Sequence, residues 1–131
     1  MDLRLPADQH YLPVVRAVAT RVAMVADCSV DDVSDFALAV DEVCASLLPS
    51  ALADSALSCR FDINDTRACV EVTVVAENGT LPPEDSLGMQ ILATLADSVH
   101  TGAAHEGPTD DGPGNWLVTT TVIKRRGPVG R

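Results

Sequence analysis

Hydrophobic residues recur along the first part of the chain at the spacing of a strand and then at that of a helix. Residues 3–5, LRL, alternate apolar and polar side chains, which predicts a short opening strand. A helix is predicted to follow from about Tyr11, because Pro13 is tolerated only in a first turn. Arg16 lies off the apolar stripe of this helix and should be exposed. The stripe consists of Leu12, Val15, Ala19 and Val22.

A capping box and a proline mark the ends of a second helix. Ser29 is followed three residues later by Asp32, the spacing at which an N-cap side chain accepts a backbone hydrogen bond. The helix should therefore begin near Val30, and Pro49 should end it because proline cannot continue a helix. The residues expected to form its buried face are Val33, Ala37, Val40, Cys44 and Leu47.

Two adjacent carboxylates, Asp41 and Glu42, interrupt the apolar run of this second helix. Glu42 shares a face with Asp35 and Ser46, because spacings of four and seven residues return to the same side of a helix. That face is either a solvated side of the helix or the floor of a site. Asp41 is expected to be structural and to pair with an arginine.

The rest of the chain predicts antiparallel strands and one more helix. Residues 57–63 and 68–79 alternate in polarity around the turn NDTR, the pattern of a hairpin. A third helix is expected over 87–98, then a flexible Gly/Pro-rich acidic loop over 102–115 and a last strand over 116–124. In the third helix, the residues expected to face inward are Met89 or Leu92, Leu95 and Ala96.

The order of these elements predicts a single α/β domain over residues 1–131. It is a two-layer sandwich in which three helices cover one face of a mostly antiparallel sheet.

Composition narrows the classes of partner. The formal net charge is -10, which argues against direct binding to nucleic-acid phosphates and favours a basic protein partner. One basic cluster, at the C-terminal end of the sequence, is expected to be solvated; it consists of Lys124, Arg125, Arg126 and Arg131. The sequence has no secretory signal pattern and no apolar run long enough to cross a membrane, so we expect a cytoplasmic protein without membrane contact.

Cysteine spacing argues against a metal centre. The four cysteines contain no CxxC pair and form no ligand cluster with His10, His100 or His105. They are expected to be free thiols, with two of them on apolar faces. The four are Cys28, Cys44, Cys59 and Cys69.

Several motifs, taken in order, resemble the RsbW/SpoIIAB-type anti-sigma factors, which are serine-protein kinases of the GHKL (Bergerat) ATPase superfamily. LRLPADQHYLPVVRAV is similar to the opening strand and the arginine-bearing first helix of the family. LAVDEVCASL stands where the family has its E-x-x-x-N motif, and AENG where it has D-x-G. SLGMQILATLADSV resembles the second glycine motif and the helix after it. The resemblance implies the histidine-kinase-like ATPase fold.

The resemblance also implies a site for ATP and Mg²⁺. Glu42 takes the position of the catalytic base, Ser46 that of the magnesium ligand, and Glu77 that of the residue that hydrogen-bonds the adenine amino group. The resemblance also implies that backbone N–H groups at a helix N-terminus lie near the phosphates of ATP, because free N–H groups and the helix dipole favour anions there. The nucleotide-binding positions are Ser46, Glu77, Gly79, Leu87 and Gly88. Asn78-Gly79 is alternatively a simple turn, and Leu87-Gly88 alternatively the start of a packed helix.

Departures from the family pattern predict a degenerate nucleotide pocket. Ser46 replaces the family asparagine, Glu77 replaces an aspartate, and Leu81 replaces the second glycine of D-x-G-x-G. Residues 80–87 are too few to form a nucleotide lid, and their two carboxylates would repel a triphosphate. Kinase activity, which depends on positioning and charge stabilisation of the phosphate, is therefore expected to be weak or lost.

The first helix is the expected partner surface. Arg16 matches the arginine that the family uses toward both its sigma factor and its antagonist, and an exposed arginine in an interface is a typical hot spot. Its exposed neighbours Val14, Ala17 and Thr20 would join the surface.

Two functions are consistent with the sequence. The first is an anti-sigma factor that sequesters a sigma factor and is released by an anti-anti-sigma protein of the STAS type. The second is an active ATP-dependent serine kinase that phosphorylates this antagonist. The resemblance further implies a homodimer.

Overall fold

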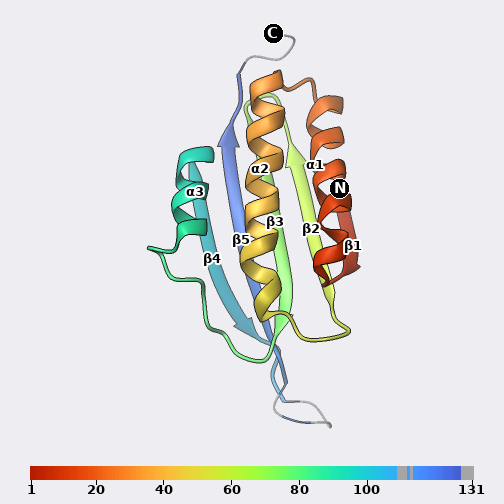
Figure 1. Cartoon of the computed structure of the whole chain (residues 1–131), viewed down its shortest axis with the longest axis vertical. Coiled ribbons are helices and arrows are strands. Elements are labelled where there is room, and N and C mark those ends of the chain that lie inside the picture. The colour runs from red at the N-terminus through yellow and green to blue at the C-terminus, as the bar shows by residue number, and fades with distance from the viewer. Residues whose placement is uncertain (109–111, 113, 128–131) are drawn as a thin grey trace.

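The computed structural model describes residues 1–108, 112 and 114–127. The described residues form three α-helices and five strands (Figure 1). Their order is β1 (Asp2–Pro6), α1 (Leu12–Val25), α2 (Val30–Leu47), β2 (Ala56–Ile63), β3 (Arg67–Ala76), α3 (Leu87–Leu95), β4 (Ser98–His105) and β5 (Trp116–Arg125), with short 3-10 helices at Gln9–Tyr11 and Leu48–Ser50.

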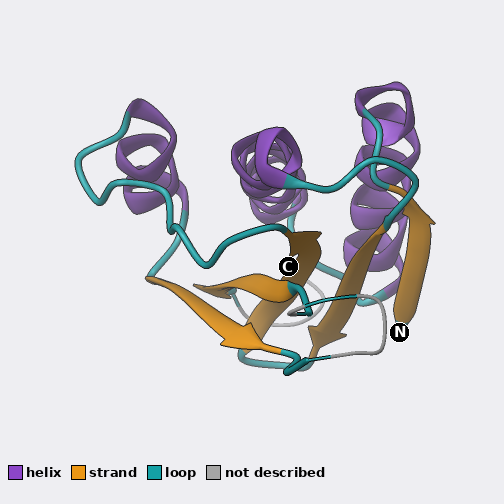
Figure 2. Ribbon diagram, turned by 90° about the horizontal axis from the view of Figure 1, so that it is seen from below, coloured by secondary structure: helices purple, strands orange, loops and turns teal. Residues whose placement is uncertain are grey.

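The five strands form one sheet in the order β1-β2-β3-β5-β4, and every neighbouring pair is antiparallel. All three helices lie on the same side of this sheet, as Figure 2 shows from below. The other face carries none of the described helices. The predicted fold class, a two-layer α/β sandwich with an antiparallel sheet covered on one face, is confirmed.

The core lies between this helical layer and the alternating apolar face of the strands. Leu57, Cys59 and Phe61 of β2 are buried, as the alternation predicted. Phe36 of α2 meets Phe61 edge to face, with ring centroids 6.2 Å apart. The core therefore joins the middle helix to the middle of the sheet.

Helix α2 is buried on a wider arc than the sequence predicted. Ala37, Val40, Cys44 and Leu47 are buried as expected, and Val33 is half-buried. The structure adds Phe36, Ala39 and Val43, because α2 packs on α1 and α3 at its sides as well as on the sheet. The hydrophobic pattern of one helix does not show that other helices will pack against both of its sides.

The predicted helix starts are confirmed. Ser29 Oγ accepts a hydrogen bond from the backbone N–H of Asp32 at 3.1 Å, and α2 begins at Val30. Helix α1 begins one residue after Tyr11, with Pro13 in its first turn.

Helix α3 ends earlier than predicted. The interpretation of 87–98 as one helix is wrong beyond Leu95, because Ala96 is extended and Ser98 already begins β4. Asp97 fixes this turn from both sides: its backbone N–H donates to Ile123 O at 2.9 Å, and its carboxylate accepts from the backbone N–H of Arg125 at 2.5 Å.

The loop expected over 102–115 begins later than expected, after β4 ends at His105. Residues 102–105 belong to β4 and pair with β5, for example Gly102 with Thr119 and His105 with Trp116. Residues 109–111 and 113 of the expected loop lie outside the described residues.

Of the basic cluster at the end of the sequence, Arg125 is exposed as expected, whereas Lys124 and Arg126 are half-buried. Lys124 Nζ lies 3.5 Å from Asp35 Oδ2, and Arg126 Nη1 donates to the carbonyl of Asn64 at 3.0 Å. The backbone N–H of Gly127 donates to Asp32 Oδ2 at 2.9 Å, so the end of β5 is tied to α2. Arg131 lies outside the described residues.

All four cysteines are free thiols. Cys44 of α2 and Cys59 of β2 are buried, in agreement with their apolar positions, whereas Cys28 and Cys69 are half-buried. A hydrogen bond with Cys59 and burial raise the pKa of the Cys44 thiol, and burial raises the pKa of Cys28 and Cys69. Among the described residues, no cluster of metal-ligating side chains is present and no helix is long and apolar enough to span a bilayer.

Candidate functional site

A cavity of about 400 Å³ lies between the C-terminal half of α2 and the segment that leads into α3. Glu42 and Ser46, one helical turn apart, supply its α2 wall, and Gly88 supplies the α3 side. Glu42, Ser46 and Gly88, which the family resemblance assigned to one site, therefore line one cavity. The complete lining is Glu42, Ala45, Ser46, Ser50, Thr80, Leu81, Pro82, Pro83, Ser86 and Gly88.

Gly88 of α3 lies directly against two side chains of α2 at this cavity. A Cβ atom on residue 88 would lie 2.8 Å from both Glu42 Oε1 and Ser46 Oγ, a separation too short for a side chain. Ser86 Oγ accepts from the backbone N–H of Met89 at 3.3 Å and so caps α3 beside the cavity. Glycine at 88 therefore allows α3 to approach the carboxylate and the hydroxyl of α2.

Three hydroxyl-bearing residues of the lining were missed by sequence reasoning: Ser50, Thr80 and Ser86. Ser50 and Thr80 lie outside α2 and α3, so no helical or strand period connects them with Glu42. Ser86 stands immediately before the third predicted helix, a typical N-cap position, and that signal could have identified it.

The positions implied for adenine contact lie apart from the cavity lining. Glu77 is exposed just beyond β3, and Asn78 Oδ1 accepts from the backbone N–H of Thr80 at 3.0 Å, as in an Asx-turn. A Cβ on Gly79 would lie 2.7 Å from Trp116 Cε3, so Gly79 is packed against an indole ring. This geometry favours the turn reading of Asn78-Gly79. Leu87 is 73% exposed and points away from the core.

The donor set fits a hydrated divalent cation better than it fits a triphosphate. Glu42 and Ser46 offer a carboxylate and a hydroxyl, oxygen ligands of the kind that Mg²⁺ accepts together with waters. The lining residues include no lysine, arginine or histidine to offset phosphate charge, and Glu84 and Asp85 stand in the adjoining loop. The described residues therefore do not fit an ATP triphosphate, and we derive no phosphoryl-transfer step at this site.

Arg16 of α1 is ordered by an ion pair that reaches across to α2. Its Nη2 donates to Asp41 Oδ2, which confirms the expectation that Asp41 pairs with an arginine. The Arg16 side chain is still 56% exposed, so a partner can reach it. Val14 is 43% exposed and Ala17 is also exposed, whereas the Thr20 hydroxyl is used within the helix and donates to the carbonyl of Arg16 at 2.9 Å.

The layered fold and the cavity between two helices place the chain in the GHKL class of histidine-kinase-like ATPase folds. Among solved structures, it is similar to a chain of the SiaB–SiaC complex from Pseudomonas aeruginosa, with a TM-score of 0.64 and 8% identity over 94% of this chain and 89% of that chain. At that identity the likeness concerns the fold alone.

Sequence similarity is more specific. The chain is 30% identical over 125 residues to the anti-sigma-F factor RsbW of Mycobacterium tuberculosis, covering 95% of this chain and 73% of that protein. It is 23% identical over 121 residues to the serine-protein kinase RsbW of Bacillus cereus, covering 76% of this chain and 74% of that protein. No protein-family model matches the chain. The chain belongs to the RsbW family of anti-sigma factors.

Replacing Gly79 tests whether this residue has a packing role. We expect Gly79→Ala to destabilise the protein by about 1–3 kcal/mol, because the new methyl group overlaps the Trp116 ring. Urea unfolding followed by the fluorescence of Trp116, the only tryptophan, measures the change. Gly102→Ala is the matched control, since the nearest atom to its Cβ would be 3.9 Å away. Equal stability of the two variants would contradict the packing role.

Proposed function

We propose that this protein is an anti-sigma factor that binds and sequesters an RNA polymerase sigma factor and thereby represses transcription initiation. The observation that carries the proposal is an exposed, ordered Arg16 on the first helix of a chain that is 30% identical to an anti-sigma-F factor. Sequestration would be steric: a sigma factor held on α1 cannot engage its other partners with the same surface.

The geometry of Arg16 supports its role as an anchor. Asp41 restrains the guanidinium before a partner arrives, so less side-chain entropy is lost on binding. Exposed apolar surface from Val14 and Ala17 lies on the same helix. A restrained arginine among apolar groups is the composition typical of a hot spot.

Net charge supports the class of partner. At a formal charge of -10, the protein attracts a basic partner over several ångströms. The DNA-contacting surface of a sigma factor has this basic character. Release would come from an anti-anti-sigma protein of the STAS type that competes for α1, as the family resemblance implies.

In this proposal, the cavity at Glu42 is a degenerate nucleotide pocket. The alternative, an active serine kinase, is favoured by one specific observation: Glu42, Ser46 and Gly88 still meet at one point. The lining contains no positively charged side chain, and the segment over it is short. Both features oppose that alternative, because phosphoryl transfer needs positive charge around the phosphate.

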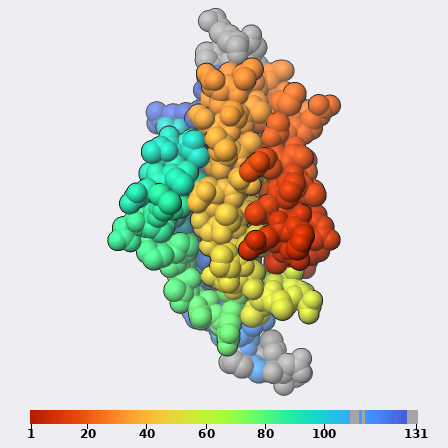
Figure 3. Space-filling model, in the orientation of Figure 1, coloured from red at the N-terminus to blue at the C-terminus, as the bar shows by residue number. Residues whose placement is uncertain are grey.

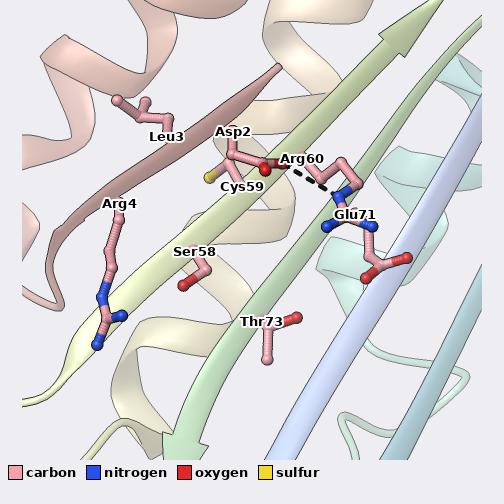
Figure 4. Close-up of a pocket in the computed structure, with 8 residues that line it drawn as sticks. All are labelled: Asp2, Leu3, Arg4, Ser58, Cys59, Arg60, Glu71 and Thr73. Atoms are coloured by element: carbon pink, nitrogen blue, oxygen red, sulfur yellow. Dashed lines mark hydrogen bonds and ion pairs between the residues drawn. The ribbon is translucent and has the colours of Figure 1, made fainter.

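A homodimer would use the sheet face that the helices leave open. Val75, Leu117 and Ile123 are half-buried on this face without packing on the helical core. Beside them a polar groove crosses β1, β2 and β3, in which Arg60 Nε donates to Asp2 Oδ1 at 3.0 Å and Glu71 lies next to Arg60 (Figure 4). A face with an apolar strip and ordered charges is suited to a second copy.

Sigma-factor capture should depend on Arg16. We expect the protein to retain a sigma factor from a native lysate, and Arg16→Glu to weaken the purified complex by at least about 30-fold, as expected for a hot-spot arginine. Titration calorimetry measures the loss. Arg67→Glu, an exposed arginine on β3, is the matched control. Asp41→Asn removes the ion pair but keeps the arginine, and so separates loss of the pair from loss of the contact.

Recovery of an unrelated protein that remains bound to Arg16→Glu would contradict the sigma-factor proposal.

Nucleotide binding should be weak. We expect Mg·ATP to bind the wild-type protein with a Kd above about 1 mM, with no phosphate transfer to a STAS-domain protein. Ser46→Asn, which restores the family residue, should strengthen Mg-dependent binding. Micromolar binding that is lost in Glu42→Ala, together with transfer of phosphate to the STAS protein, would instead establish the kinase alternative.

The oligomeric state should depend on the open sheet face. Sedimentation of the purified protein should give twice the mass of one chain, and Leu117→Glu should shift it to a monomer, because a carboxylate cannot be buried unpaired. Leu38→Glu, at a residue 49% exposed on α2, should leave the dimer intact. A monomeric wild-type protein would overturn this part of the proposal.

A further inference from the structure

The outer face of α1 differs in charge from the rest of the protein. The sequence of α1, LPVVRAVATRVAMV, contains no acidic residue and two arginines, within a chain whose net charge is -10. Figure 3 shows α1 at one edge of the helical layer, beside α2. A partner with acidic groups would be repelled by most of this protein but attracted by this helix.

The two arginines of α1 are not equivalent. Arg16 is already paired with Asp41, so its charge is largely compensated. Arg21 is exposed and forms no ion pair with any of the residues that the structure describes. The available positive charge on this helix is therefore that of Arg21.

Arg21 stands beside an apolar groove. A shallow cavity of about 440 Å³ follows the helix, and Met24 at its end is 51% exposed. Its lining consists of Pro13, Arg16, Ala17, Thr20, Arg21 and Met24. An apolar groove with a guanidinium in its lining that has no ion-pair partner among the described residues fits a partner surface in which an apolar side chain is followed by a carboxylate.

We propose that Arg21, in the lining of this groove, receives a carboxylate from the anti-anti-sigma antagonist that competes for α1. The inference rests on the proposed function and deepens it. A sigma factor approaches with a basic surface, which the acidic residues of this protein attract and Arg21 repels. The antagonist competes for the same helix, and an acidic contact to Arg21 gives it a contact that the sigma factor does not have. Arg16 thus serves both partners, and Arg21 discriminates between them.

The test measures both partners against the same variants. The probes are the sigma factors and STAS-domain proteins encoded in the genome of the source organism, each purified and titrated into the full-length protein. Arg21→Glu should weaken binding of the antagonist by about 10-fold or more, and this loss should be smaller at high salt. The same substitution should change the affinity for the sigma factor by less than about 3-fold. Arg21→Gln should give an intermediate loss, and Arg67→Glu none.

A charge exchange assigns the contact. Replacing the antagonist carboxylate by arginine should weaken binding to the wild-type protein and restore it to Arg21→Glu. Unchanged thermal unfolding of Arg21→Glu shows that the helix tolerates the acidic residue near its C-terminal end, where the dipole disfavours it.

Four results would overturn the inference. Antagonist affinity that is insensitive to Arg21→Glu, or equal losses for both partners, removes the discriminating role of Arg21. If Arg21→Glu changes the sedimentation of the free protein, the groove is assigned to a second copy of the chain instead. If the wild-type protein binds no sigma factor and no STAS protein, the proposed function itself fails. The first two results, by contrast, would overturn the inference and leave the proposed function intact.

Discussion

Burial of α2 is the constraint on which the Arg16 ion pair and the cavity at Glu42 both depend. The helix packs on the sheet and lies between α1 and α3, so a polar residue that faces a neighbouring helix lies at one of its two flanks. Asp41 lies toward α1, where Arg16 meets it. Glu42, about 100° further around the helix, lies toward α3, where Gly88 meets it. One helix therefore fixes Arg16, the proposed partner contact, and the cavity relative to each other.

Local patterns predicted the elements but not where distant segments stop them. The N-cap at Ser29 and the strand alternation act within a few residues, and both were confirmed. The apolar spacing of 87–98 is helical to its end, yet α3 stops because Asp97 is held by β5, 28 residues away in sequence. Lys124 was expected in solvent for the same reason: its partner, Asp35, lies on α2. Long-range hydrogen bonds and ion pairs leave no periodic signal.

The candidate site was predictable to the extent that it lies on a helix. Glu42 and Ser46 share a face by spacing alone, and the family resemblance supplied Gly88, which the structure brings against both. The hydroxyls of Ser50 and Thr80 come from irregular segments, where sequence gives no register. Gly79 illustrates the opposite case, since its close contact with Trp116 depends on a residue at the start of the last strand.

The function proposed above combines a reduced nucleotide pocket with a retained partner surface, and the two regions have different physical requirements. Phosphoryl transfer needs a metal ligand, positive charge and a closed lid at the same time, so losing one part removes most of the benefit of the rest. Partner binding, as proposed, is concentrated in a few anchors on α1, which lies on the other side of α2 from α3. The ion pair of Arg16 with Asp41 lies on the α1 side of α2, whereas the altered residues, Ser46 and the segment 80–87, lie on the α3 side. Under the proposed function, selection on sigma-factor binding alone would therefore act on the α1 side of α2 and not on its α3 side.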